Sequence, residues 1–318
     1  VRERSSDRVT DDENFSPPQT FAFDLRYDLW QTDLGLKLEL AESNSLTHQN
    51  EVALFWSHPE YRVSFDGKQF DENGVLITPF DAGWTYYRGN QGHLRYTFRS
   101  LGRAVDTDIN PRGGRALTVS YVRAHDQLFE NGEFEYGFRP KFTKNHYNQY
   151  TLDWREFVGL PWLRHSLRLR LYGAVIDSDV NDFFWFYLGG RDGIRGYTYY
   201  TIGGRKGVMG SVAYRFPIVR NINRQFLSLY LRDCYGGVFF EAANSWEGVS
   251  TQENEFKKSV GYELRMSLGS YYLFPTAISL VSAYAFDPVA LKVQGFPVTI
   301  KQEEGWSYYF SVGFAFDL

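Results

Sequence analysis

Apolar and polar side chains alternate with a period of two along much of this chain. In the last segment, residues 306–318, every even position is apolar or aromatic, and the odd positions are mostly small or polar. The same split recurs in residues 94–99, 150–155, 167–172 and 262–268. Neighbouring side chains of a β-strand point to opposite faces of the sheet. The pattern therefore predicts strands with one apolar and one polar face.

The composition of the two faces indicates a membrane-spanning sheet. The apolar face is rich in Tyr, Trp and Phe, and these residues make up 18% of the chain. The mean hydropathy is only −0.40, because a charged face offsets the apolar one. No apolar run approaches the roughly 18 residues that a transmembrane helix needs. Since backbone groups in lipid must all be paired, we expect an all-β, transmembrane, antiparallel up-and-down β-barrel.

The pattern also predicts a strand number. Single-chain bacterial barrels have an even number of strands, and a spacing of about 25 residues per strand predicts three strands before Leu94, hence twelve in all. Polar breaks at residues 31–33 and 57–60 would instead give five strands there, hence fourteen. Long connections over 125–145, 177–206, 244–257 and 287–305 are expected outside the cell. From Leu94 onward we expect strands near residues 93–101, 115–124, 146–157, 165–176, 207–217, 225–243, 258–269, 276–286 and 306–318.

Two parts of the chain are expected from this pattern. Residues 1–19 are a polar N-terminal leader, and residues 20–318 are the barrel. Because no apolar signal segment opens the chain, we expect a mature protein of the outer membrane of a Gram-negative bacterium. The formal net charge of −4 argues against a nucleic-acid partner.

No catalytic, metal or cofactor site is expected. The six histidines show no metal-ligand spacing, and no Gly-x-Ser-x-Gly sequence is present. We therefore expect a protein that is not an enzyme, although a dispersed Ser–His pair, as in a membrane phospholipase, stays open. The charged residues of the polar face are expected to neutralise one another rather than to line a substrate path.

Four sequence blocks carry a family resemblance. The first contains Gly189, Gly190, Ile194, Arg195, Gly196 and Tyr197, and the strand motif after it is Tyr214, Arg215, Phe216 and Pro217. The others are a turn over 106–115, an aromatic-acidic strand over 236–246, and the terminal Ser311, Gly313, Phe316 and Leu318. In this order, over about residues 90–318, they resemble the outer-membrane insertase superfamily, the bacterial surface antigen family. It includes the BamA and TamA assembly barrels and the two-partner-secretion transporters.

The resemblance implies a loop folded into the barrel lumen and held there by Arg195. In the family, a Glu on the strand after the loop and an Asp on the next strand hold this arginine. Here those positions are Ala213 and Glu241. We therefore predict a hydrogen bond between Arg195 and Glu241, and leave open whether Arg195 also uses Glu263 or Asp233. Because the second acid of the family is missing, we expect the loop to be held more weakly than in relatives. The four loop glycines are expected to supply positive backbone φ angles.

The resemblance also implies function and partners. We expect a barrel that moves or inserts a polypeptide, or a lipid, at the outer membrane. A passive small-solute pore and a membrane-anchor translocator of a larger protein are the alternatives. Expected partners are membrane lipids, lipopolysaccharide, the outer-membrane assembly machinery that reads the last strand, and a polypeptide client; the oligomeric state is left open. We expect a short member without polypeptide-transport-associated domains.

Overall fold

The computed structural model describes most of the chain, and the strands account for nearly all of its regular structure. It describes residues 2–9, 20–41, 47–70, 76–102, 109–130, 133–135, 139–161, 164–248, 255–270, 274–292 and 299–313. The strands are β1 (Arg2–Val9), β2 (Thr20–Glu39), β3 (His48–Phe70), β4 (Leu76–Arg88), β5 (Gln91–Leu101), β6 (Gly113–Leu128), β7 (Phe134–Glu135), β8 (Arg139–Pro140), β9 (Thr143–Gly159), β10 (Ser166–Ile176), β11 (Phe186–Tyr187), β12 (Gly203–Val219), β13 (Arg224–Phe226), β14 (Leu229–Gly248), β15 (Lys257–Ser270), β16 (Phe274–Ala285), β17 (Val289–Lys292), β18 (Thr299–Gln302) and β19 (Gly305–Gly313). A single short 3-10 helix, η1 (Asp182–Phe184), stands among these described elements, and none of their helices is long and apolar enough to cross a membrane.

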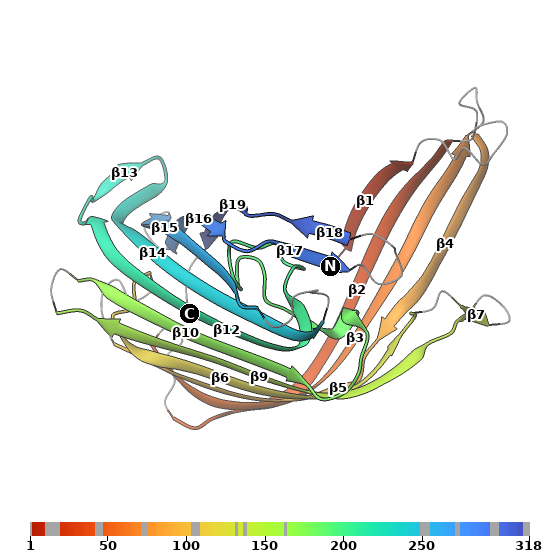
Figure 1. Ribbon diagram of the computed structural model, residues 1–318, viewed down its shortest axis with the longest axis horizontal. Helices are drawn as coiled ribbons and strands as arrows, with labels where there is room; N and C mark the ends of the chain where they lie inside the picture. Colours follow the sequence, from red (N-terminus) through yellow and green to blue (C-terminus); the bar gives the residue numbers. More distant parts are fainter. Residues whose placement is uncertain are drawn as a thin grey trace. The chain divides into compact units, whose positions relative to one another are not determined.

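Fifteen of these strands form one antiparallel sheet. Its order runs β1-β2-β3-β4-β6-β9-β10-β12-β14-β15-β16-β19 (Figure 1). Beside this path, β5 pairs β3 and β6, β11 pairs β12, and β13 pairs β14. A strand is present at each of the nine positions predicted from Leu94 onward, and most of these strands extend beyond the predicted limits. The antiparallel all-β class is therefore confirmed.

The N-terminal part contains three strands, β2 to β4, between residues 20 and 88. The two polar breaks lie inside β2 and β3, so the interpretation of these breaks as turns is wrong. The Gln31 amide donates hydrogen bonds to the carboxylate of Asp33 at 3.1 Å and to the Ser57 hydroxyl at 3.2 Å. The polar residues thus bond across neighbouring strands rather than turning the chain.

The expected leader is also partly strand. Backbone pairing joins Arg2–Val9 to residues 21–28 of β2, and this ladder uses only main-chain groups, so the polar composition does not prevent it. Closure of the sheet into a barrel, and with it the number of twelve strands, stays a prediction.

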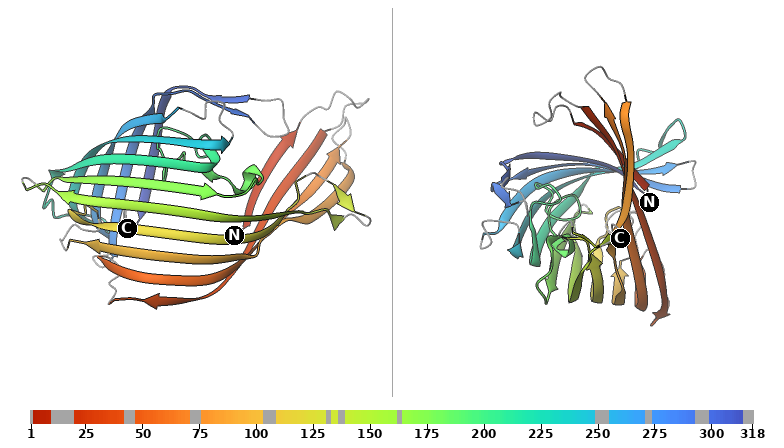
Figure 2. Two further views of the ribbon diagram at one scale, coloured as in Figure 1. Left: turned by 60° about the horizontal axis from the view of Figure 1, so that its bottom comes forward. Right: turned by 90° about the vertical axis from the view of Figure 1, so that its right-hand side faces the viewer.

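The chain divides into two compact units. Unit 1 takes the described parts of 1–36, 54–93 and 122–147, and unit 2 takes those of 37–53, 94–121 and 148–318. Within unit 2, strands β10, β12, β14, β15, β16 and β19 lie side by side in this order, and the chain between β10 and β12 lies within their curve (Figure 2). Two of the long predicted connections contain small hairpins, β7–β8 and β17–β18.

Burial on the strands of unit 2 is the reverse of that in a water-soluble sheet. The apolar side chains of β19 point outward, with Tyr308 72% and Phe310 65% exposed, whereas Ser311 is buried. On β15, Tyr262 is exposed while Glu263 and Arg265 are buried. Large exposed apolar residues beside buried charges need a nonpolar surrounding outside the sheet. We call the side that carries Glu263 and Arg265 the polar face.

Candidate functional site

The segment between β11 and β12, residues 188–202, forms a compact loop on the polar face, here called the Arg195 loop. Its ends are joined by a hydrogen bond from the Leu188 amide to the Ile202 carbonyl at 2.8 Å. The chain then folds back on itself, because the Ile194 amide donates to the Leu188 carbonyl and the Gly190 amide to the Tyr197 carbonyl, both at 2.7 Å. These bonds satisfy main-chain groups that would otherwise be buried without partners.

Glycine is required in this loop for two different reasons. Gly190 has a φ of 87°, a conformation that other L-residues rarely adopt. At Gly196, a Cβ atom would lie 2.7 Å from the Ser259 hydroxyl and 2.9 Å from the Ala285 amide nitrogen. Of the four glycines for which positive φ was expected, only Gly190 has it, so that prediction is wrong for the other three. Gly189, Gly193 and Gly196 instead allow close approach of neighbouring atoms.

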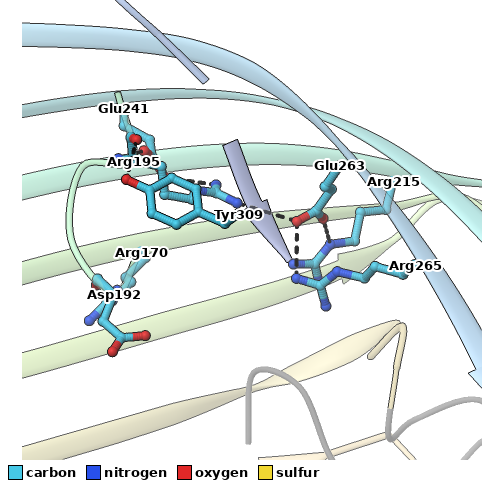
Figure 3. Close-up of polar contacts among 8 residues, drawn as sticks. All are labelled: Arg170, Asp192, Arg195, Arg215, Glu241, Glu263, Arg265 and Tyr309. Carbon is cyan, nitrogen blue, oxygen red and sulfur yellow. Dashed lines mark hydrogen bonds and ion pairs between the residues drawn. The ribbon is translucent and has the colours of Figure 1, made fainter. Parts of the chain in front are cut away.

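Arg195 is the residue that fastens the loop to the sheet (Figure 3). Its main-chain N–H donates to Glu241 Oε2 at 2.7 Å, and its side-chain Nε donates to Oε1 of the same carboxylate at 2.8 Å. A terminal guanidinium nitrogen also lies 2.7 Å from Glu241 Oε1. Both residues are buried, at 6% and 2% exposure. The predicted contact between Arg195 and Glu241 is therefore present, and charge-assisted bonds of this kind are the strong ones.

A second carboxylate completes the site, since Glu263, one of the two further partners left open by the sequence, contacts Arg195. Glu263 on β15 accepts a hydrogen bond from Arg195 at 3.3 Å, another from Arg215 Nε at 2.6 Å and a third from Arg265 at 3.1 Å. The alternative partner Asp233 instead accepts a hydrogen bond from the Asn221 amide at 3.0 Å. Glu263 thus supplies the negative charge that Ala213 cannot.

The charge of Arg195 is held by these contacts. Burial alone would lower the pKa of its guanidinium, but the carboxylates of Glu241 and Glu263 outweigh burial and raise that pKa above its ordinary value. In addition, the guanidinium carbon lies 3.4 Å from the centre of the Phe239 ring, a cation–π contact. Phe239 precedes Glu241 by two residues on the same face of β14, and sequence reasoning did not single it out.

The end of the chain also holds the loop. The Tyr309 hydroxyl of β19 donates to the Arg195 carbonyl at 2.8 Å, and the Gly196 carbonyl accepts from Gln302 at 3.1 Å and from Ser307 at 3.2 Å. Sequence reasoning missed these three residues, because a carbonyl acceptor leaves no trace in the pattern of side chains.

Apolar packing supports the loop beside its ionic contacts. Ile194 and Tyr197 are both fully buried, in a cluster with Leu188, Met209 and Ala285. The Tyr197 hydroxyl donates to the carbonyl of Asp287 at 3.0 Å or to that of Lys258 at 3.2 Å. Burial raises the pKa of Tyr197 to about 12.

The other predicted motif residues lie on β12 and β19. Arg215 is buried against Glu263, as described, while Tyr214 hydrogen-bonds the His165 ring. Pro217 marks a shift in the register with β14, which suits a residue without an N–H, and Phe216 pairs Gly236 just before that shift. Ser311 is 2.6 Å from the Ser279 hydroxyl, and Gly313 is the last residue of β19. Phe316 and Leu318 lie outside the described residues.

The remaining charges of the polar face continue the network. Asp153 on β9 accepts two hydrogen bonds from Arg170, at 3.1 and 2.9 Å, and pairs with Arg155 at 3.0 Å. Arg170 also donates to the carbonyl of Asp192 in the Arg195 loop at 2.7 Å. The loop is therefore also held at Asp192, besides its contacts at Arg195 and Gly196.

Amphipathic antiparallel strands with their apolar side exposed are typical of proteins that cross the outer membrane as β-barrels, and this chain falls in that class. Within the class, it belongs to the Omp85 superfamily, since the family model for the Omp85 superfamily domain matches residues 30–316. The match confirms the resemblance to the outer-membrane insertase superfamily, whose members are outer-membrane proteins of Gram-negative bacteria. A comparison with curated proteins gave no match.

Proposed function

We propose that this protein moves or inserts a polypeptide, or a lipid, at the outer membrane, and that the Arg195 loop is its plug. Membership of the superfamily supports an insertase or translocation barrel. The observation that carries the role of the loop is the buried contact of Arg195 with Glu241. In the closed barrel expected for this sheet, the polar face lines the lumen, and the loop fills part of it.

Two arrangements of the loop follow from this proposal. When Arg195 holds its carboxylates, the loop blocks the lumen; when the contact breaks, the loop can leave and the lumen opens. Such a two-state element is a common basis of switching. With two carboxylates and three further bonds to the carbonyls of Arg195 and Gly196, the closed arrangement is strongly favoured at rest.

Recordings in planar bilayers test the plug. The unmodified protein should show rare, short openings, and Arg195→Ala should make them frequent and larger. Arg224→Ala removes an exposed arginine from β13, and this control should behave as the unmodified protein does. A large, steady conductance of the unmodified protein would favour a passive pore instead. No change on replacing Arg195 would show that the loop is not the plug.

Photo-cross-linking in cells tests the client. Val281 on β16 faces the cavity beside the loop, and a photoreactive amino acid placed there should form adducts with polypeptide or with lipid. The yield should rise in the Arg195→Ala background, because the loop then no longer shields the position. Absence of adducts in both backgrounds would contradict passage through the lumen.

A further inference from the structure

A cavity of about 290 Å³ lies between the Arg195 loop and the polar face. Its walls come from β9, β10, β12, β14, β15 and β16 as well as from the loop. All of the residues that line the cavity belong to unit 2. Six arginines line it: Arg155, Arg168, Arg170, Arg191, Arg195 and Arg265.

Among the residues that the structure describes, arginines outnumber carboxylates around the cavity. Three described carboxylates line it, those of Asp192, Glu241 and Glu263, against the six arginines, so this described lining carries a surplus of three positive charges. Asp153, which pairs with Arg155 and Arg170, adds one negative charge. Arg215, which pairs with Glu263, adds one positive charge, so the surplus stays at three.

Part of this surplus is buried, whereas Arg191 is exposed. Arg168, Arg195 and Arg265 are all buried, at 9% exposure or less. Like charges held close together away from water repel each other more strongly than they do on an open surface. A cavity with one sign of charge and low-dielectric walls raises the local concentration of ions of the opposite sign.

We propose that this cavity is an anion-binding site that takes a phosphate group. Guanidinium groups present planar forks of donors that match phosphate oxygens, which makes arginine the favoured residue for phosphate recognition. The volume is sufficient, since each water in the liquid occupies about 30 Å³ and a phosphate ion takes the place of only a few waters.

Ser211 supports a ligand in this cavity. Its side chain lines the cavity and is buried, and its hydroxyl has no hydrogen-bond partner among the described residues. A buried hydroxyl without a partner carries a free-energy cost that a ligand oxygen can remove. Figure 3 shows Arg170 and Asp192 on one side of Arg195, and Glu263 with Arg265 on the other.

The phosphate could belong to a small solute or to a lipid headgroup, and binding measurements separate the two. Inorganic phosphate is titrated into the folded protein in nonionic detergent by isothermal titration calorimetry. Bis-phosphorylated lipid A and its dephosphorylated form are then added to the micelles as competitors. Competition by the phosphorylated lipid alone assigns a headgroup site, whereas phosphate binding without competition assigns a site for a free phosphate or phosphate ester.

Substitutions test the location of the site. Arg168→Gln should weaken phosphate binding about 10- to 100-fold, the effect of losing one charged hydrogen-bonding partner. Arg191→Gln alters an exposed loop residue of the same lining, so it tests the site even if the buried variant fails to fold. Arg224→Gln, outside the cavity, should bind as the unmodified protein does. Folding is checked by heat-modifiable migration on gels.

The proposal goes beyond the transport function, and neither Arg168 nor Arg191 belongs to the contact between Arg195 and Glu241. Saturable binding that weakens in both cavity variants and persists in Arg224→Gln supports the site. Absence of saturable phosphate binding in the unmodified protein overturns it. Binding of equal strength in the unmodified protein and in the folded cavity variants overturns it as well.

Discussion

Replacing Glu241 with Gln should release the Arg195 loop while leaving the sheet folded. The carboxylate receives the main-chain N–H of Arg195 at 2.7 Å and its Nε at 2.8 Å, and it is buried. Glutamine keeps one acceptor oxygen but turns an NH₂ donor toward the guanidinium. The loss of charged hydrogen bonds of this type costs about 2–3 kcal/mol. Since about 1.4 kcal/mol corresponds to a factor of ten, the population of the open loop should rise about 30- to 150-fold.

Hydrogen exchange read by mass spectrometry measures this opening. The peptide over residues 188–202 contains the amide of Arg195, which donates to Glu241, and that of Thr198, which donates to the side chain of Gln302. Their exchange should accelerate by the same factor in Glu241→Gln, because these bonds to groups outside the loop break when the loop leaves the sheet.

A matched charge removal serves as control. Glu247→Gln loses ion pairs with Lys206 at 2.6 Å and Arg205 at 2.5 Å, but its side chain is 38% exposed, so water screens these pairs and their loss should change stability little. Exchange over 188–202 that is equal in Glu241→Gln and Glu247→Gln would refute the assignment of Glu241 as the holder of the loop.

Four further results are expected. Gly196→Ala should lower thermal stability by about 1–3 kcal/mol through overpacking, whereas Gly210→Ala, where a Cβ meets nothing within 4 Å, should not; equal melting temperatures would contradict the close approach. Tyr309→Phe should cost about 1 kcal/mol, the value of one hydrogen bond to the Arg195 carbonyl, and a chemical denaturation series measures it. Burial raises the pKa of Tyr197 from its ordinary value of 10.0 to about 12, so its neutral form stabilises the loop fully below pH 10, and this contribution is lost as the pH rises through about 12. Hydrogen exchange of the loop amides in Tyr197→Phe should lack this pH dependence. Deleting residues 316–318 should leave the protein in the periplasm, and heat-modifiable protein in the outer membrane after the deletion would refute the terminal residues as an assembly signal.

Much of the fold could be predicted because a strand shows its two faces directly in the sequence. In 262–268, where apolar and polar residues alternate, the structure has a strand on which Glu263 and Arg265 are buried. The same rule failed at residues 31–33, where polar side chains suggested a turn. There the amide of Gln31 bonds the hydroxyl of Ser57, a contact 26 residues away that periodicity does not reveal.

Only those residues of the site that belong to a family motif could be predicted from the sequence. Arg195 and Glu241 could be paired in advance because both stand in blocks that resemble the family. Glu263 could be named only as a possible further partner. Its local sequence does not show whether its carboxylate accepts hydrogen bonds from three arginines or from a single neighbouring one. The hydroxyl of Tyr309 bonds a main-chain carbonyl 114 residues away, and such a partner depends on the fold alone.

The bonds from β19 to the loop bear on the order of folding. Arg195 and Gly196 each offer a carbonyl that is satisfied by the last part of the chain, at Tyr309, Gln302 and Ser307. During assembly these acceptors have no partner until the terminal strand has joined the sheet, and contacts so distant along the chain form slowly. The loop therefore reaches its full set of bonds only in a chain whose last strand is in place. Protection of residues 188–202 would thus serve as a reporter of completed biogenesis.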